Sequence, residues 1–126
     1  MPRKKTKSKT KSKSKTKRTT RKRRILRVGS DYEIYIGLIT KNGRYVKNAV
    51  DKLKRILLRE GILGYTQIRA RGFWKGKGEP SLIVSFINTY NLSGQEVKRI
   101  AKKIKRAFRQ ESVLLVRDRI KYTFVE

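Results

Sequence analysis

The chain has 126 residues, of which 36 are Lys or Arg and 9 are Asp or Glu, so its formal net charge is +27. It contains no Cys and no His, which excludes disulfide bonds, thiol chemistry and the Ser-His-Asp or Cys-His catalytic pairs, and argues against a zinc site. No apolar run reaches the roughly 18 residues of a transmembrane helix, and the basic N-terminus lacks the apolar region of a signal peptide.

Residues 1–28 form a segment of their own, in which fifteen Lys and Arg occur without any Asp or Glu. Like charges at this density repel one another and cannot be buried, so we expect a disordered, extended arm. A flexible cationic arm is typical of proteins that bind nucleic acid. The predicted phosphate contacts are Lys4, Lys5, Lys7, Lys9, Lys11, Lys13, Lys15, Lys17, Arg18, Arg21, Lys22, Arg23 and Arg24.

Residues 29–126 are expected to form one domain, which by itself carries a net charge of +12. Apolar residues alternate over 31–40, which predicts a strand with Ile34, Ile36 and Leu38 on its core face. A turn at 41–43 leads into a helix over 46–60, because Val46, Val50, Leu53 and Leu57 recur at helical spacing. Gly61 is the expected C-terminal cap of this helix.

The second half of the domain repeats this order. Strands are predicted over 65–74 and 81–88, joined by a Gly-rich turn at 75–78; Ile68 and Ala70 face the core in one of two registers. Ser93 and Glu96 have the spacing of a capping box, which opens a helix that runs to about residue 110. A strand at 112–116, a turn at 117–119 and a strand at 120–124 complete the chain.

The predicted order is β-α-β-β-α-β followed by a hairpin. Right-handed crossovers place both helices on one face of an antiparallel sheet. The fold class is therefore α+β, a ferredoxin-like domain with a C-terminal β-hairpin extension, preceded by the disordered basic arm.

Two further groups of cations are candidate nucleic-acid contacts. The outer face of the second helix is almost entirely basic, and the second hairpin places aromatic residues between cations, as single-strand binding requires. The candidates are Lys98, Lys102, Lys105 and Arg109 on the helix, and Arg69, Arg71, Trp74, Lys75 and Lys77 on the hairpin. Whether Trp74 stacks on bases or belongs to the core stays open at this point.

Enzyme chemistry has little support in the sequence. The acids next to predicted loops are Asp31, Glu33, Glu79 and Asp118, and their spacing matches no metal-dependent nuclease motif. Glu79, beside Pro80, is interpreted as a residue that stabilises the hairpin between the strands at 65–74 and 81–88. The Gly-rich turn at 75–78 lacks the residue spacing of a Walker phosphate-binding loop, which argues against nucleotide binding there. We therefore expect no enzymatic activity, no cofactor and no metal.

Three segments resemble short phage and microbial proteins that have a strand with Gly, a G-W-x-G-x-x-E-x-S hairpin and a Q-E-x-V strand. They are the segments beginning Tyr35-Ile-Gly, Gly72-Phe-Trp and Gln110-Glu-Ser, and the resemblance covers residues 33–125. Phe73 and one extra residue before Glu79 depart from the hairpin pattern. The resemblance implies the same fold and a viral or mobile-element origin, and no mechanism. The basic arm resembles those of viral nucleoproteins.

The sequence thus predicts a non-enzymatic protein that binds DNA or RNA with little sequence preference, in viral genome condensation or packaging. Two alternatives remain: a ribonucleoprotein or ribosomal component, and a virion protein that oligomerises through its domain. No small-molecule substrate and no membrane partner are expected, and a homo-oligomer is left open. The expected location is intracellular, with nucleic acid, in a virion, nucleoid or nucleus.

Overall fold

The computed structural model describes residues 26–126. The predicted arm, apart from its last three residues, lies outside the described residues. Two compact units are distinguished, one with residues 29–120 and one that includes residues 26–28 and 121–126. In the smaller unit, the rings of Tyr122 and Phe124 pack edge to face with their centroids 5.9 Å apart. The prediction of a separate domain starting at residue 29 is not tested by this division.

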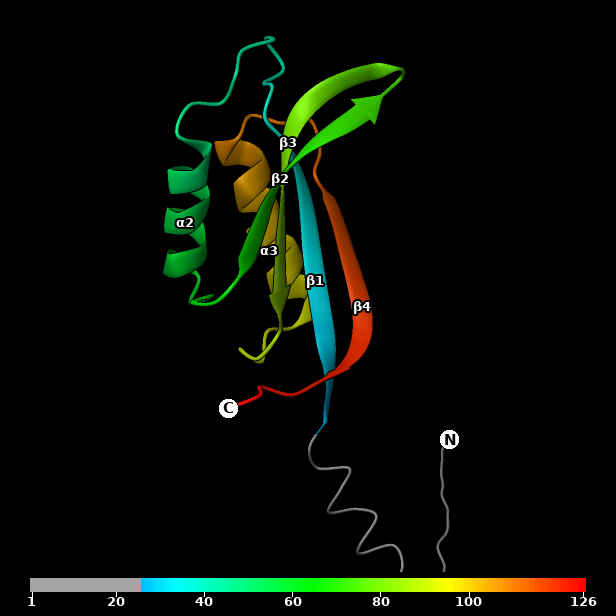
Figure 1. The fold of residues 1–126 in the computed structure, drawn as a ribbon. Coiled ribbons are helices and arrows are strands. Elements are labelled where there is room, and N and C mark those ends of the chain that lie inside the picture. Colours follow the sequence, from blue (N-terminus) through cyan, green and yellow to red (C-terminus); the bar gives the residue numbers. More distant parts are fainter. Residues whose placement is uncertain (1–25) are drawn as a thin grey trace, which may run out of the picture. The chain divides into compact units, whose positions relative to one another are not determined.

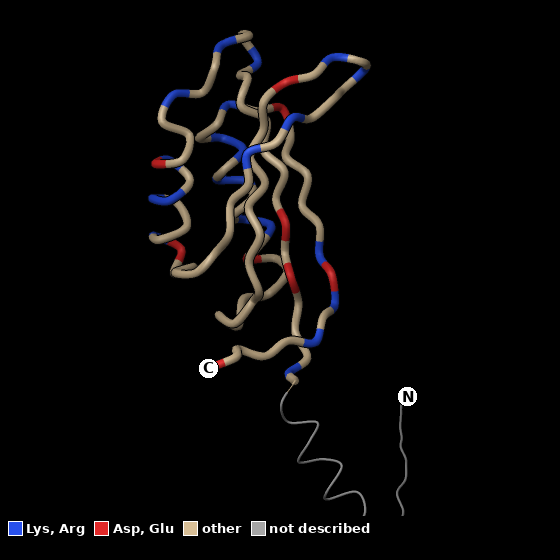
Figure 2. Tube along the Cα trace, in the orientation of Figure 1, with Lys and Arg blue, Asp and Glu red and all other residues tan. Residues whose placement is uncertain are grey.

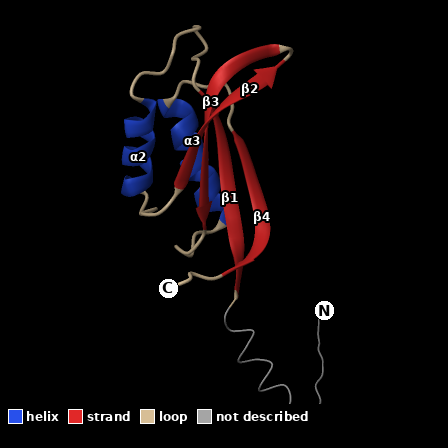
Figure 3. Ribbon diagram, viewed as in Figure 1, coloured by secondary structure: helices blue, strands red, loops and turns tan. Residues whose placement is uncertain are grey.

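The element order is β1 (Arg27–Gly37), α2 (Ala49–Arg59), β2 (Thr66–Trp74), β3 (Lys77–Ile87), α3 (Gly94–Ala107) and β4 (Leu114–Tyr122). The strands form one sheet in the order β2-β3-β1-β4, and β3 runs antiparallel to both β2 and β1. Both helices cover the same face of this sheet (Figures 1 and 3). The ferredoxin-like α+β prediction is confirmed.

The core lies between the sheet and the two helices. Its buried residues include Ile34 and Ile36 of β1, Leu38 directly after β1, Leu53 and Leu57 of α2, Val97, Ile100 and Ile104 of α3, and the C-cap residue Phe108. Burial of apolar side chains at these spacings holds each helix on the sheet.

The ends of the helices are fixed by the predicted signals. Ser93 Oγ accepts a hydrogen bond from the backbone N–H of Glu96 at 3.1 Å, and Glu96 Oε1 accepts one from the backbone N–H of Ser93 at 2.8 Å. These bonds hold the pKa of Glu96 below its usual value, because they favour the ionised carboxylate. Gly61 adopts a φ of 85° after the C-cap of α2, a conformation that favours glycine.

The sheet differs from the prediction in three places, and one is the start of β3, which lies at Lys77 within the predicted turn at 75–78. No hairpin extends the C-terminus, because β4 is a single strand that runs through Arg117, Asp118 and Arg119. All three side chains are exposed, and β4 is an edge strand, where charged residues are tolerated. The register of β2 places Ile68 opposite Ile83 and leaves it 52% exposed, so it does not face the core.

The sheet face opposite the helices carries acids in an otherwise basic chain. Asp31 and Glu33 lie in β1, along which Figure 2 shows acidic positions. Ser85 Oγ donates to Asp31 Oδ1 at 3.1 Å, and the Tyr35 hydroxyl donates to Glu33 Oε1 at 3.0 Å. This bond to Glu33 raises the pKa of Tyr35 above its usual value, because it stabilises the protonated phenol.

Candidate functional site

The segments that carry the phage resemblance meet at one place in the fold. β1 ends at Gly37, which pairs with Ser81 of β3, and the backbone N–H of Leu38 donates to Pro80 O at 3.0 Å. This pairing brings Glu79 beside the end of β1. A Cβ built on Gly37 would lie 2.6 Å from Gln110 Oε1 and 3.0 Å from Glu79 Oε1. A glycine at position 37 therefore makes room for two side-chain oxygens from distant parts of the chain.

Gln110 is held firmly in this position. It is 8% exposed, and its Nε2 donates to Ile39 O at 2.8 Å and to Phe108 O at 3.0 Å. Its backbone N–H donates to Lys105 O at 3.0 Å, which closes the end of α3. Because both amide hydrogens are used on backbone carbonyls, the side-chain oxygen is left as an acceptor on the Gly37 side.

A pocket of about 370 Å³ opens at this point, and we call it the Trp74 pocket. Its volume is within the range of small-molecule sites. Its lining combines two carboxylates, an amide, an ammonium group, two hydroxyls and an indole. These side chains belong to Glu79, Glu111, Gln110, Lys41, Thr40, Ser112 and Trp74. The pocket thus offers an aromatic wall together with hydrogen-bond acceptors and charges of both signs.

Trp74 is placed on this pocket by a tight hairpin. It ends β2 and pairs with Lys77 across Lys75 and Gly76, whose φ angles of 51° and 78° are those of a type I′ turn. The indole is 74% exposed, and the ammonium group of Lys75 lies 6.0 Å from its centroid. Trp74 is therefore not a core residue, and its ring is free within the described residues to stack on a planar ligand.

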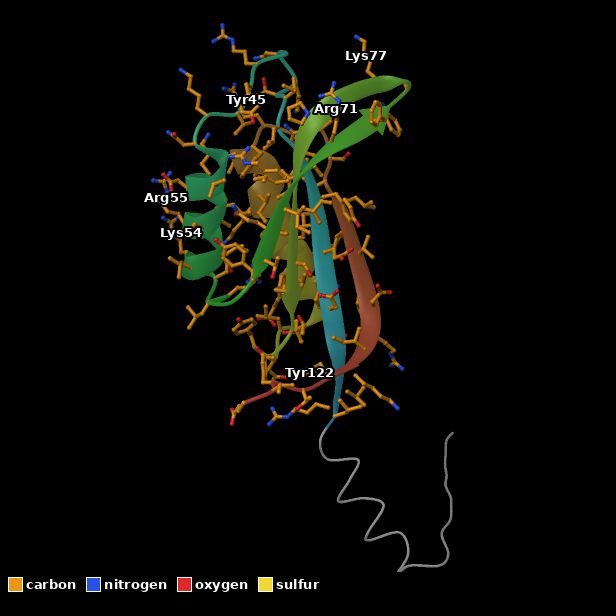
Figure 4. The ribbon with its side chains drawn as sticks, viewed as in Figure 1. Tyr45, Lys54, Arg55, Arg71, Lys77 and Tyr122 are labelled. Carbon is orange, nitrogen blue, oxygen red and sulfur yellow. The ribbon has the colours of Figure 1, made fainter. Side chains whose placement is uncertain are left out.

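Apart from Trp74, none of the predicted contact residues within 26–126 lines the Trp74 pocket. Arg71 lies on the β2–β3 hairpin, where its guanidinium is 5.9 Å from the ring centroid of Phe73, and Lys77 lies near the tip (Figure 4). Arg69 and Lys75 are exposed on the same hairpin. Lys98 and Lys102 are exposed along α3, Lys105 is half-buried in its last turn, and Arg109 follows the helix. The thirteen predicted arm contacts, Lys4 to Arg24, lie outside the described residues.

No group of three or more Asp, Glu, His or Cys side chains in residues 26–126 is arranged to hold a metal ion. Neither described helix has the length and apolar character of a membrane-crossing segment.

The sequence alone does not identify Gly37, Glu79 and Gln110 as neighbours. Its patterns place Glu79 in a hairpin and Gln110 at the end of a helix. The available signal was that these residues belong to three separate segments of one resemblance pattern. Such segments are expected to converge when they share a site, but their adjacency appears only in the folded chain.

No protein-family model matches the chain, and no curated protein matches it. Several solved structures are similar to the chain. A phage SAM lyase in its apo state is 25% identical, with a TM-score of 0.58 over 77% of this chain and 90% of that chain. A phage SAM lyase in complex with S-methyl-5′-thioadenosine is 23% identical, with a TM-score of 0.51 over 76% of this chain and 90% of that chain.

CPII, a nitrogen regulatory PII-like protein from Thiomonas intermedia K12 bound to ADP, AMP and bicarbonate, is 14% identical. Its TM-score is 0.53 over 80% of this chain and 99% of that chain. This likeness and that of the S-methyl-5′-thioadenosine complex show the shared fold alone.

These comparisons overturn the functional prediction made from the sequence. The similar structures are a phage SAM lyase, which is an enzyme, and a PII-like protein bound to ADP, AMP and bicarbonate, and none of them contains a named nucleic acid. The expectations of a nucleic-acid-binding protein, of no enzymatic activity and of no small-molecule substrate are therefore wrong. The ribonucleoprotein and virion alternatives belong to the same prediction and are wrong with it. The misleading signal was the charge of the arm and of α3, which indicates attraction to polyanions but identifies no site.

Proposed function

We propose that the chain binds S-adenosylmethionine in the Trp74 pocket and cleaves it to S-methyl-5′-thioadenosine. The observation that carries the proposal is the pair of oxygens from Glu79 and Gln110 above Gly37, next to an exposed indole. The 25% identical phage SAM lyase, which is matched over 90% of its length, supports the same substrate.

The pocket suits the adenosyl part of this substrate. The exposed ring of Trp74 offers a stacking surface for a planar adenine. The oxygens of Glu79 and Gln110 are neighbouring acceptors, and the two hydroxyl groups of a ribose are neighbouring donors. A carboxylate acceptor strengthens such hydrogen bonds relative to neutral ones.

The chemistry requires that the bond between the sulfonium sulfur and Cγ of the methionine part breaks. We assign the attack on Cγ to the substrate's own carboxylate oxygen. The electron pair of the broken bond goes to sulfur, which becomes a neutral thioether, and the methionine part closes into a five-membered lactone. No water and no proton transfer is needed, and an intramolecular nucleophile has a large entropic advantage. The protein's task is to hold the reactive conformation and exclude water.

This route defines the role of Glu79. The positive charge of the sulfonium disappears as the bond breaks, so a carboxylate placed against sulfur would stabilise the ground state more than the transition state. Glu79 is therefore assigned to orienting the ribose. Glu79→Gln keeps one acceptor oxygen, and it is expected to raise KM more than it lowers kcat.

The decisive experiment is a product assay. Full-length protein is incubated with S-adenosylmethionine, and S-methyl-5′-thioadenosine is measured by chromatography and mass spectrometry against buffer and heat-denatured protein. We expect multiple turnovers with the native chain and a marked loss in Trp74→Ala. Product formation no faster than in buffer would refute the proposal, provided that the protein melts cooperatively.

The phage or mobile-element origin implied by the three segments stays a prediction, and so does the intracellular location. We propose that these segments form the sequence signature of this site, since each contributes to it: Gly37 from the first, Trp74 and Glu79 from the second, and Gln110 from the third.

A further inference from the structure

A second pocket, of about 320 Å³, lies at the C-terminal end of α3. It shares Thr40, Lys41 and Gln110 with the Trp74 pocket. Its remaining lining is Asn42, Lys105, Arg106 and Arg109, so four cationic side chains line it and no carboxylate does. We call it the Arg109 pocket.

The cations of the Arg109 pocket are left without acidic partners in the described part of the chain. Within residues 26–126, the ion pairs both involve Glu60. This carboxylate pairs with Arg99 and Lys103 of α3, and neither of these lines the Arg109 pocket. Concentrating four positive charges without a carboxylate is costly unless an anion enters. The pocket therefore has the electrostatic character of an anion site, which its neighbour with Glu79 and Glu111 does not.

The walls of the pocket are built from two segments that are tied together. The loop after β1 folds on itself: Thr40 N–H donates to Arg44 O at 2.7 Å, and Gly43 N–H donates to Thr40 O at 2.8 Å. The backbone N–H of Lys41 donates to Arg109 O at 3.3 Å, which joins the loop to the end of α3. The four charges therefore come from a defined framework of backbone hydrogen bonds.

Arg109 itself occupies an unusual position. It follows the C-cap of α3 with a φ of 54°, a left-handed conformation that glycine or asparagine adopts more easily. Lys105 and Arg106 lie in the last turn, where cations are favoured by the helix dipole, and this alone accounts for them. It does not account for an arginine in a strained conformation, nor for Lys41 on the facing loop.

We propose that the Arg109 pocket binds a phosphate-type oxyanion, either free phosphate or the phosphate group of a nucleotide. Arginine and lysine are the side chains that bind phosphate through charge-assisted hydrogen bonds, and Thr40 and Asn42 supply neutral donors. The site is separate from S-adenosylmethionine cleavage, and its existence does not depend on that activity.

The test is a titration of the ¹⁵N-labelled full-length chain with sodium phosphate at constant ionic strength, followed by amide chemical shifts. Saturable shifts at residues 40–42 and 105–110 are expected. Shifts confined to residues 1–25, or shifts that rise linearly without saturation, would overturn the proposal.

Arg109→Gly separates binding from folding. Glycine relieves the left-handed strain, so the melting temperature should stay the same or rise, while phosphate affinity falls by at least about tenfold. Arg55→Gln is the matched control, because Arg55 points outward from α2 (Figure 4) and its removal lowers the net charge equally. Equal affinity losses in the two variants would show nonspecific charge attraction and refute the site.

AMP distinguishes the two sources of phosphate. Because the Trp74 pocket is itself assigned to an adenosyl group, AMP is compared with adenosine, which lacks the phosphate. If the ligand is a nucleotide, AMP binds more tightly than either phosphate or adenosine, and Arg109→Gly removes its advantage over adenosine. If the ligand is free phosphate, AMP causes shifts at residues 105–109 with no higher affinity than phosphate. Absence of saturable shifts at residues 105–109 with both phosphate and AMP would overturn the proposal.

Discussion

The side-chain oxygens of Glu79 and Gln110 converge on Gly37, on the side where every other residue type would carry a Cβ. Glu79 comes from β3 and Gln110 from the segment after α3, so the arrangement depends on the complete fold. Gln110 cannot turn away freely, because its amide donates to Ile39 O and Phe108 O. The small size of Gly37 is therefore a requirement of the site.

Gly37→Ala tests this requirement. The added methyl group would lie 2.6 Å from Gln110 Oε1, closer than real contacts allow, so Gln110 or β1 must move. We expect a stability loss of about 1–3 kcal/mol from overpacking and a loss of S-adenosylmethionine binding of at least about tenfold. Urea denaturation and calorimetric titration measure the two effects.

Gly72→Ala is the control for that substitution. Gly72 also lies in a strand, but the nearest atom to its added Cβ is Ser81 Oγ at 3.8 Å, an ordinary contact. Substrate affinity should be unchanged in Gly72→Ala. Equal losses in the two variants would mean that any strand alanine disturbs the sheet, and that Gly37 has no special relation to the site.

Trp74→Ala separates the stacking role from a structural one. The indole is 74% exposed, so its removal should change stability by no more than about 0.5 kcal/mol. Substrate affinity should fall by about 0.5–1.5 kcal/mol, the range of aromatic stacking. Phe73→Ala is a close control, because Phe73 is 71% exposed and adjacent but does not line the Trp74 pocket. If both variants lose affinity equally, the hairpin acts as a whole and the specific role of Trp74 is refuted.

The helices could be predicted because their signals are local. The apolar period of α3 and its Ser93–Glu96 cap lie within one segment, and the structure reproduces both. Residues 117–119 are predicted as a turn but form part of β4, because the signal for this strand is not local. Three consecutive charged residues are typical of a turn, whereas pairing at the sheet edge depends on a neighbour that is distant in the sequence.

The site was less predictable than the fold. Gly37, Glu79 and Gln110 are separated by more than thirty residues from one another, and nothing in any single segment marks them as partners. Residues 1–28 carry more than half of the net positive charge, so the composition favours a protein that binds polyanions. The net charge of a chain determines which ions and polymers it attracts at long range. The chemistry of a site depends instead on the few groups that the fold brings together.

The capping box predicts a pH dependence of stability. The pKa of Glu96 is lowered in the folded protein, chiefly because its carboxylate accepts the backbone N–H of Ser93. A group whose pKa is lower in the folded state stabilises the fold above its unfolded pKa, and that contribution is lost as the pH falls through the folded pKa. Native protein should therefore be more stable than Glu96→Gln near neutral pH, and the difference should shrink on acidification.

Urea melts between about pH 7 and pH 3, which brackets the titration of glutamate, measure this difference. Ser93→Ala is the comparison, because it removes the other half of the capping box without a titratable group and should cost about 1 kcal/mol. A stability gap between native protein and Glu96→Gln that grows toward acidic pH would contradict the assignment.

A chain that starts at Gly29 should fold and keep the proposed activity. The buried apolar residues run from Tyr32 to Phe108, and Arg27 and Val28, the first residues of β1, are exposed. All residues assigned to the Trp74 pocket lie between Gly37 and Ser112. We expect a cooperative thermal transition and a kcat for S-adenosylmethionine cleavage within about twofold of the full-length value, since substrate contacts are unchanged. A truncated chain that folds but has lost turnover would place residues 1–28 in the catalytic cycle and would contradict a site built from the domain alone.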